Sequence, residues 1–370
     1  MIVVLTLAVA SLAWANGAND NFKGVATLYG SRTVSFMTAR YWATLTTAAG
    51  GLASLWIANG LAQSFSGGVI GTGFRTDATL ISTALAGGAT VMLATRLGMP
   101  ASTTHALLGA WVGSAIVTSS EAIDWSLLMT RFAKPLVVSP LLSMLLAGGL
   151  YWVLSRVRRR MRISGETCVC VGSSAVALVP AGALARDSSS AAEMDLCVAD
   201  TAQCVQNYRG QFFGVRAQSI VNAAHFLASG AVCLARGSND TPKVAALLIG
   251  AGLFAEFSSL SLLTWVVAPM LFGGWLESHR VARTMGRHIT TMNTGQGLTA
   301  NLVAAFLVLS ASTMGLPVST THVVCGAIFG IAMVNRQADL RVVSQIVTTW
   351  VTTLPLGFLL GAACSGVIAA

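Results

Sequence analysis

The chain has 370 residues, of which 54% are hydrophobic and only 9% are charged. A soluble globular protein carries about 25% charged residues, so this composition excludes a chain folded in water and predicts a polytopic membrane protein. The formal net charge of +9 does not point to nucleic acid, because the Lys and Arg residues lie in short loops where they face lipid headgroups and set topology.

The first apolar run, residues 2–15, resembles a signal peptide in that Ala13-Trp14-Ala15 is a small-residue cleavage pattern. No basic segment precedes it, and the motif that follows recurs in mid-chain, so we interpret the run as a membrane segment. Apolar stretches predict membrane segments at 2–15 running into 24–31, then 38–60, 78–95, 98–118, 125–154, 216–235, 244–274, 290–312, 315–335 and 341–366.

A polar stretch divides these segments into two groups. It opens with an arginine cluster at 156–162 and holds Cys168, Cys170, Cys197 and Cys204, whose spacing matches no zinc pattern. We expect a first transmembrane repeat at 1–155, a polar cytoplasmic linker at 156–215 with reduced thiols, and a second transmembrane repeat at 216–370.

An internal repeat supports this division. Residues 14–30 and 234–250 share eight of 17 positions, including both Asn-Asp pairs, and GMPASTTHALLGAWVG at 98–113 matches GLPVSTTHVVCGAIFG at 315–330 at nine of 16. Both blocks occur in the same order, so the two halves are homologous.

The distribution of basic residues predicts the orientation of the halves. If the arginine cluster at 156–162 is cytoplasmic, Arg32, Arg40, Arg96 and the loop 277–288 are cytoplasmic too. Five crossings per half then invert the second half relative to the first, as in secondary transporters. After the polar STTH run only residues 106–118 remain apolar, so a half-membrane hairpin is the alternative, and we expect it to change this parity.

The Asn-Asp motifs, GANDNFK at 17–23 and GSNDTPK at 237–243, place charges inside apolar runs. Lys23 and Lys243 are either surface partners of the aspartates that extend to the interface, or charge partners in a buried site. Gly17, Gly237 and Pro242 predict broken helices, whose free backbone groups bind ions at membrane depth.

The STTH runs predict helix starts, with Pro100 and Pro317 in the first turn. Hydroxyls and free N–H groups converge there, which suits a tetrahedral oxyanion, whereas simple N-capping is the alternative reading. Because the run recurs in both halves, we favour binding by Ser102, Thr103, Thr104, Ser319, Thr320 and Thr321.

Other polar residues in apolar runs leave two readings open. His105 and His322 fit packing better than a proton relay. Glu256 is a candidate cation or proton site, with no acidic counterpart in the first half. The patch NTGQGLTAN, with Asn293, Thr294, Gln296 and Asn301, fits either helix-start chemistry or ligand contact.

These motifs together resemble the inorganic phosphate transporter (PiT) family over nearly the whole chain outside 163–211. The resemblance rests on GANDNFKGVATLYGS, GMPASTTH, GSNDTPK and the run from GRHITT to GAIFG. It implies an all-α, inverted-repeat transporter with broken helices and re-entrant, hairpin-like segments, and a homodimer in the plasma membrane, here a bacterial inner membrane.

The resemblance also implies a site for phosphate and its coupling cation. The implied phosphate ligands are Asn19, Asp20, Asn239, Asp240 and the two Ser-Thr-Thr runs. From the polar patch we add Gln296. For Na⁺ or H⁺ we name Asp20, Asp240, Glu256 and Asn293, with Na⁺ at the two aspartates. The chain departs from the family pattern, since 293–298 reads NTGQGL where many members carry a Thr-Pro-Ser run, and many relatives lack Lys at 23 and 243.

The function expected is import of inorganic phosphate coupled to Na⁺ or H⁺, by alternating access and without a cofactor. A permease for sulfate or another tetrahedral oxyanion is the alternative, and a passive anion channel is a weaker one. An enzyme is not expected, because no Gly-x-Ser-x-Gly or HExxH motif is present.

Overall fold

Helices make up most of the described chain. The computed structural model describes residues 1–57, 59–67, 76–118, 123–160, 168–170, 204–206, 211–212, 215–253 and 259–369.

The elements of the first half are α1 Ile2–Asp20, the 3-10 turn η1 Lys23–Val25, α2 Ala26–Gly30, α3 Phe36–Ile57, α4 Asn59–Gly67, α5 Asp77–Arg96, α6 Thr103–Thr118, α7 Trp125–Leu127, the π-helical turn η4 Leu128–Ala133 and α8 Lys134–Arg160. Those of the second half are α9 Ala217–Gly250, α10 Ser259–Glu277, α11 His279–Arg283, the π-helical turn η7 Thr284–His288, α12 Thr294–Thr313, α13 Thr320–Asn335 and α14 Leu340–Ala369.

Strands occur only as short pieces in the described part of the linker. β1 Cys168–Cys170 pairs antiparallel with β2 Cys204–Gln206, and β3 Gln211–Phe212 pairs antiparallel with β4 Val215–Arg216. Among the described helices, six are long and apolar enough to cross a bilayer. The fold is therefore that of an all-α, multi-pass membrane protein, as the sequence predicts.

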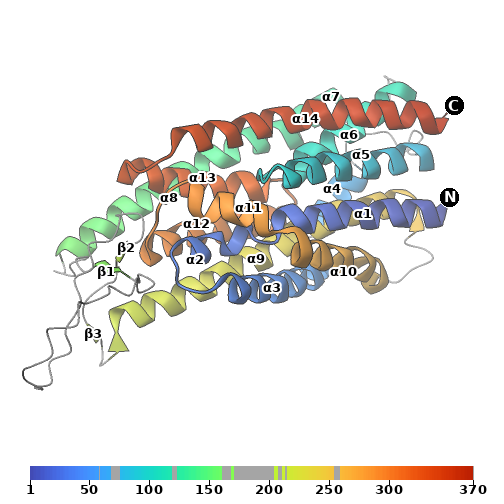
Figure 1. Cartoon of the computed structure of the whole chain (residues 1–370). Coiled ribbons are helices and arrows are strands. Elements are labelled where there is room, and N and C mark those ends of the chain that lie inside the picture. The colour runs from blue at the N-terminus through green and yellow to red at the C-terminus, as the bar shows by residue number, and fades with distance from the viewer. Residues whose placement is uncertain are drawn as a thin grey trace, which may run out of the picture.

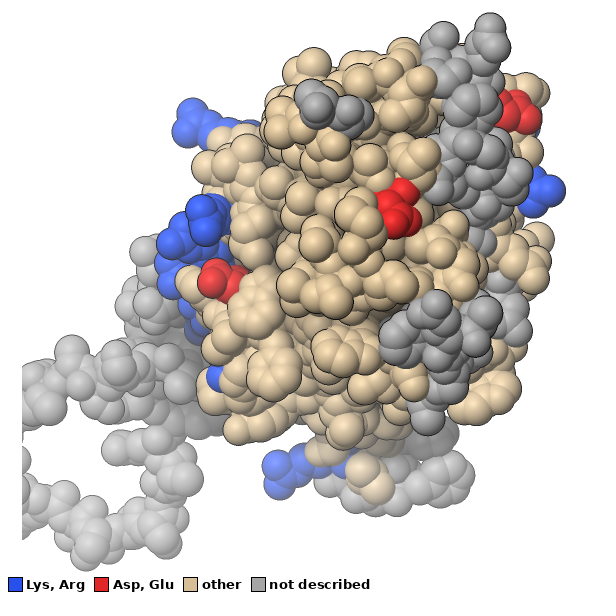
Figure 2. Space-filling model, turned by 90° about the vertical axis from the view of Figure 1, so that its right-hand side faces the viewer, with Lys and Arg blue, Asp and Glu red and all other residues tan. Residues whose placement is uncertain are grey.

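The two ends of the molecule differ in charge. Figure 1 shows both chain termini at one end, whereas the end of α8 and the starts of α9 and α14 lie at the other. Viewed end-on from the side of the termini, the surface is mostly uncharged, with Lys and Arg near its margins (Figure 2). α8 carries its arginines, up to Arg160, into the opposite end.

The predicted helix breaks at the Asn-Asp motifs are only partly correct. α1 continues through Gly17 to Asp20 and ends there, so its break follows the motif. α9 is continuous from Ala217 to Gly250, and Pro242 lies inside it. A proline removes one N–H from the ladder, and this long helix continues past that loss.

The glycines of the motifs serve close packing rather than breakage. A Cβ on Gly17 would lie 1.8 Å from the carbonyl oxygen of Met270 in α10, and one on Gly237 would lie 2.4 Å from that of Thr47 in α3. Both values are far below van der Waals contact. Glycine here allows two helix backbones to touch, which membrane helices use for association.

We expect Gly17→Ala to destabilise the protein by about 1–3 kcal/mol, because overpacking at a backbone contact forces α1 and α10 apart. The measurement is the unfolding temperature in detergent. Gly149→Ala is the matched control, since a Cβ at Gly149 in α8 meets nothing within 4 Å. Equal unfolding temperatures for the two variants would contradict this packing role.

α6 and α13 are short helices whose N-termini face each other near the middle of the molecule (Figure 1). Each has 16 residues, or about 24 Å at 1.5 Å per residue, against about 30 Å for a bilayer core. The rings of His105 and His322, near these N-termini, are 4.6 Å apart. Their length favours the half-membrane alternative that the sequence left open.

α6 and α13 begin a few residues later than the sequence predicts. Pro100 and Pro317 lie before the helices, not in their first turns. Ser102 and Ser319 precede the first helical residues instead, and their hydroxyls accept hydrogen bonds from the N–H groups of His105 and His322. The prolines thus hold extended segments that lead into the N-termini.

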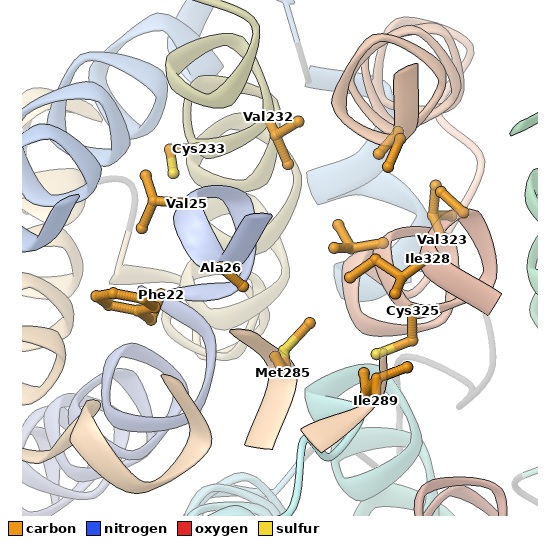
Figure 3. Close-up of a cluster of buried hydrophobic side chains, with 14 of the residues drawn as sticks. Phe22, Val25, Ala26, Val232, Cys233, Met285, Ile289, Val323, Cys325 and Ile328 are labelled. Carbon is orange, nitrogen blue, oxygen red and sulfur yellow. The ribbon is translucent and has the colours of Figure 1, made fainter. Parts of the chain in front are cut away.

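An apolar core surrounds the turn that follows Asp20. Phe22 and Val25 of this turn and Ala26 at the start of α2 belong to one buried cluster with Val232 and Cys233 of α9, and Figure 3 shows Val25 beside Cys233. Met285, Ile289 and residues of α13 close the other side of the cluster. Because Lys23 lies between Phe22 and Val25, this packing fixes the backbone from which its side chain extends.

Candidate functional site

A buried polar cluster lies where α1, α9 and the N-termini of α6 and α13 meet. Its members, called the central cluster below, are each at most 4% exposed: Asn16, Asp20, Lys23, Thr103, Thr104, Arg236, Asp240, Lys243, Thr320 and Thr321. Ionised groups at membrane depth are costly unless they are paired or face a functional cavity. So many in one place predict a functional site.

The two lysines make matching contacts in the two halves. Lys23 Nζ donates to Asp20, to the carbonyl oxygen of Ala101 at 2.7 Å and to Thr321. Lys23 is 1% exposed, so the interpretation of this lysine as a surface group that extends to the interface is wrong.

Lys243 repeats the pattern with the roles of the two halves exchanged. Its Nζ lies 3.3 Å from Asp240 Oδ1, 2.6 Å from the carbonyl oxygen of Val318 and 3.0 Å from Thr104 Oγ1. Each lysine therefore joins the aspartate and the loop of its own half to a threonine of the other half.

The two aspartates are brought together through one amide. Asn16 Nδ2 lies 3.4 Å from Asp20 Oδ2, 3.5 Å from Asp240 Oδ2 and 3.0 Å from Thr103 Oγ1. Thr103 and Thr320 each donate to the aspartate of their own half at 3.4 Å. The predicted convergence of the two acidic motifs, with the threonines around them, is present in the structure.

Arg236 is a member of the cluster that the sequence analysis missed. Its Nη2 donates to Asn16 Oδ1 at 2.7 Å, its Nη1 lies 3.4 Å from Asn21 Oδ1 and 3.3 Å from Thr47 Oγ1, and its Nε lies 3.5 Å from Asp240 Oδ2. The Nε atom is buried without a hydrogen-bond acceptor. A guanidinium with spare donor capacity in a buried site suits an anion.

A signal for Arg236 was present in the sequence. It is the arginine directly before GSND, inside the apolar run of α9. The repeat alignment passes over it because its counterpart is Asn16, a different residue. An intramembrane arginine is by itself a functional hypothesis.

Asn19 and Asn239 hold the loops ahead of α6 and α13, and only Asn239 also contacts the cluster, through Asp240. Asn19 donates to Thr95 Oγ1 and the Met99 carbonyl, and it accepts from the Ala101 N–H at 2.9 Å. These contacts fix the segment that leads into α6.

The second copy makes corresponding contacts. Asn239 donates to the Val318 carbonyl at 3.2 Å and to Asp240 Oδ1 at 3.1 Å, and it accepts from Ser312 at 3.3 Å. Both asparagines, predicted as phosphate ligands, have their amides engaged by protein groups here.

The serines and histidines fit the simpler alternatives. Ser102 and Ser319 are N-caps, as the capping reading has it. His105 Nδ1 donates to the carbonyl oxygen of Trp350 at 3.0 Å, and His322 Nδ1 donates to that of Leu136 at 3.2 Å. These are packing contacts to α14 and α8.

The polar patch that opens α12 forms a helix start. Asn293 and Gln296 close a capping box, and Gln296 Nε2 donates to Tyr151 Oη at 3.1 Å. Asn301, two turns further on, donates to the carbonyl oxygen of Gly24. The structure thus places Asn293 and Gln296 in helix-start contacts, and their ligand roles stay predictions. Glu256 lies outside the described residues.

Comparison with known proteins places this arrangement in a family. The chain matches the sequence model described as the phosphate transporter family over residues 16–361. The chain belongs to this family. Its members are transporters, so the chain is not an enzyme.

Relatives of this phosphate transporter family member cover nearly its whole length. A candidate phosphate permease of Thermococcus kodakarensis is 27% identical over 95% of this chain and 93% of its own. The chloroplastic inorganic phosphate transporter 2-1 of Arabidopsis thaliana is 26% identical over 94% of this chain and 68% of its own. A solved structure titled the sodium-dependent phosphate transporter has a TM-score of 0.76 at 19% identity, covering 100% of this chain and 98% of that one. This last likeness establishes the fold.

Proposed function

We propose that this chain imports inorganic phosphate, coupled to a cation, by alternating access around the central cluster. The observation that carries the proposal is the burial of both Asn-Asp motifs together with two helix N-termini and three basic side chains. Family membership supports phosphate as the cargo.

The electrostatics of the cluster favour an anion. Lys23, Lys243 and Arg236 against Asp20 and Asp240 leave one net positive charge when all five are ionised. The N-termini of α6 and α13 add partial positive charge at the same place. An anion of one negative charge, such as dihydrogen phosphate, would neutralise the cluster.

The hydrogen-bonding groups suit phosphate better than sulfate. Arg236, Asn16 and the threonine hydroxyls donate to unprotonated oxygens, whereas Asp20 and Asp240 accept from protonated ones. Sulfate carries no proton at neutral pH, so its oxygens would face both carboxylates without a hydrogen bond. This difference favours phosphate over the sulfate alternative.

The arrangement of the helices supports an inverted repeat. α1 and α9 carry the two motifs, and α6 and α13 point away from each other on either side of the cluster (Figure 1). If α5–α6 and α12–α13 are hairpins that enter from opposite sides, each half keeps an odd number of crossings. In that arrangement each hairpin would replace two crossings by none, so the parity of each half would be kept.

Transport would then consist of one half moving against the other. Lys23–Thr321 and Lys243–Thr104 join the halves directly across the cluster. Breaking the Lys23–Thr321 contact or the Lys243–Thr104 contact, one at a time, would open the site to one side of the membrane, as alternating access requires. We place the basic end of the molecule in the cytoplasm and the chain, as a homodimer, in a bacterial inner membrane.

The test is uptake of labelled phosphate into proteoliposomes that hold the purified protein. When a cation gradient is imposed, we expect phosphate to accumulate inside the vesicles against its own gradient. Arsenate should compete with phosphate for uptake, whereas about a tenfold excess of sulfate should have little effect. Flux that only follows the phosphate gradient would favour the passive channel. Strong competition by sulfate would favour the oxyanion alternative.

A further inference from the structure

The ammonium groups of Lys23 and Lys243 each lie among three oxygens of different kinds. Around Lys23 these are the Asp20 carboxylate, the carbonyl oxygen of Ala101 and the hydroxyl of Thr321. Around Lys243 they belong to Asp240, Val318 and Thr104, at 2.6 to 3.3 Å.

This oxygen set is one that a small hard cation would select. Carboxylate, carbonyl and hydroxyl oxygens are the ligands of such ions in proteins. Both carbonyls come from non-helical residues ahead of α6 and α13, and backbone carbonyls in unwound segments coordinate Na⁺ in transporters. In each half a lysine nitrogen lies among these oxygens.

We propose that Lys23 and Lys243 are tethered cations that occupy two positions where sodium would otherwise bind, so that phosphate import by this chain does not use sodium. The inference rests on the proposed function and concerns its coupling ion. It leaves protons as the ion that couples.

Two observations separate this reading from accidental packing. The first is duplication: Asp20 and Lys23 recur at an offset of 220, and Ala101 and Thr104 correspond to Val318 and Thr321 at an offset of 217. The three oxygen types therefore arise twice from related positions. A chance contact of a long side chain would not recur with each partner exchanged between the halves.

The second observation is charge. The cluster already has one net positive charge without any mobile cation. A sodium ion at either carboxylate would lie beside an ammonium group that is itself at most 2% exposed. Repulsion between like charges is strong where water is excluded. Each lysine therefore occupies its position and also disfavours the binding of a sodium ion beside it.

The first experiment uses the wild-type protein in proteoliposomes. Phosphate uptake driven by an imposed pH gradient is expected to be equal in sodium and choline media, with no co-transport of labelled sodium. Uptake that needs sodium, or sodium carried with phosphate, would overturn the inference. Absence of phosphate uptake in both media would instead count against the proposed function, so the two failures are distinguishable.

The second experiment restores an open position. In Lys23→Asn the ammonium is replaced by a shorter side chain with an amide oxygen, and sodium is expected to stimulate its uptake about tenfold, because the ion again neutralises Asp20. Lys23→Met fills the space without charge or oxygen, and we expect low uptake that sodium does not restore. A folded Lys23→Asn protein indifferent to sodium would contradict the inference.

Lys134→Asn is the matched control, since Lys134 is exposed at the start of α8. Its uptake should equal that of the wild type in both media. Lys243→Asn should behave as Lys23→Asn does. If neither cluster variant folds, the labelled-sodium measurement on the wild type still decides.

Discussion

Phosphate uptake is expected to fall by about 100-fold or more when Asp240 is replaced by Asn, because removing one partner of a buried ion pair costs about 3–5 kcal/mol. Asp240 is 3% exposed and faces both Lys243 and Arg236. The Asn amide keeps the shape of the side chain but removes its negative charge. It also replaces one carboxylate oxygen by an NH₂ group. If that group takes the place of Oδ2, Asn16 and Thr320 lose their hydrogen-bond acceptor.

Asp20→Asn should have a similar effect through Lys23. The measurement is the initial rate of phosphate uptake in proteoliposomes, normalised to protein that elutes as a single species in detergent. Asp77→Asn, in the first turn of α5, is the control and should transport normally, since Asp77 has no part in the cluster. Near-normal uptake by both Asp20→Asn and Asp240→Asn would remove the site from the Asn-Asp motifs.

The sequence predicted the membrane class and the meeting of the motifs for a physical reason. A bilayer admits few charges, so those that remain must find partners, and duplicated motifs then point to one shared site. Asp20, Asp240 and the threonines of both STTH runs therefore lie where the pattern indicated. That reasoning needs no knowledge of how the helices pack.

Packing decided what the sequence could not. The sequence pattern predicts Gly17 and Gly237 to be helix breakers, yet each allows a neighbouring backbone to approach, and only the partner helix reveals that. Asn19 and Asp20 are adjacent, yet the helix directs one toward the Met99 loop and the other toward the cluster. A residue's neighbours in space settle such roles.

Arg236 was missed for a related reason. An alignment of the two halves points only to positions where the residues are identical. Asn16 and Arg236 occupy equivalent positions but differ, so the alignment gives no signal there. In the structure this pair is joined directly, Nη2 to Oδ1 at 2.7 Å. The departure from symmetry lies at the centre of the cluster, and a single ligand bound there would not need to contact the two halves equally.

Replacing Arg236 by Gln is expected to raise the KM for phosphate about 10- to 100-fold, because a hydrogen bond to a charged group contributes about 1.5–3 kcal/mol and tenfold in affinity is about 1.4 kcal/mol. The change also takes the net charge of the cluster from one positive to zero. We expect a smaller effect on maximal rate, since the motif carboxylates and both lysines remain.

The Arg236→Lys variant separates charge from geometry. It keeps the positive charge but loses the planar fork that reaches Asn16, Asn21 and Thr47 together, so KM should lie between those of the wild type and Arg236→Gln. Arg341→Gln, at an exposed position at the start of α14, should leave KM unchanged. If Arg236 only braced α9 against α1 and α3, both cluster variants would lower the unfolding temperature while KM stayed at the wild-type value. A selective rise in KM, graded from Lys to Gln, is the result that an anion-binding guanidinium requires.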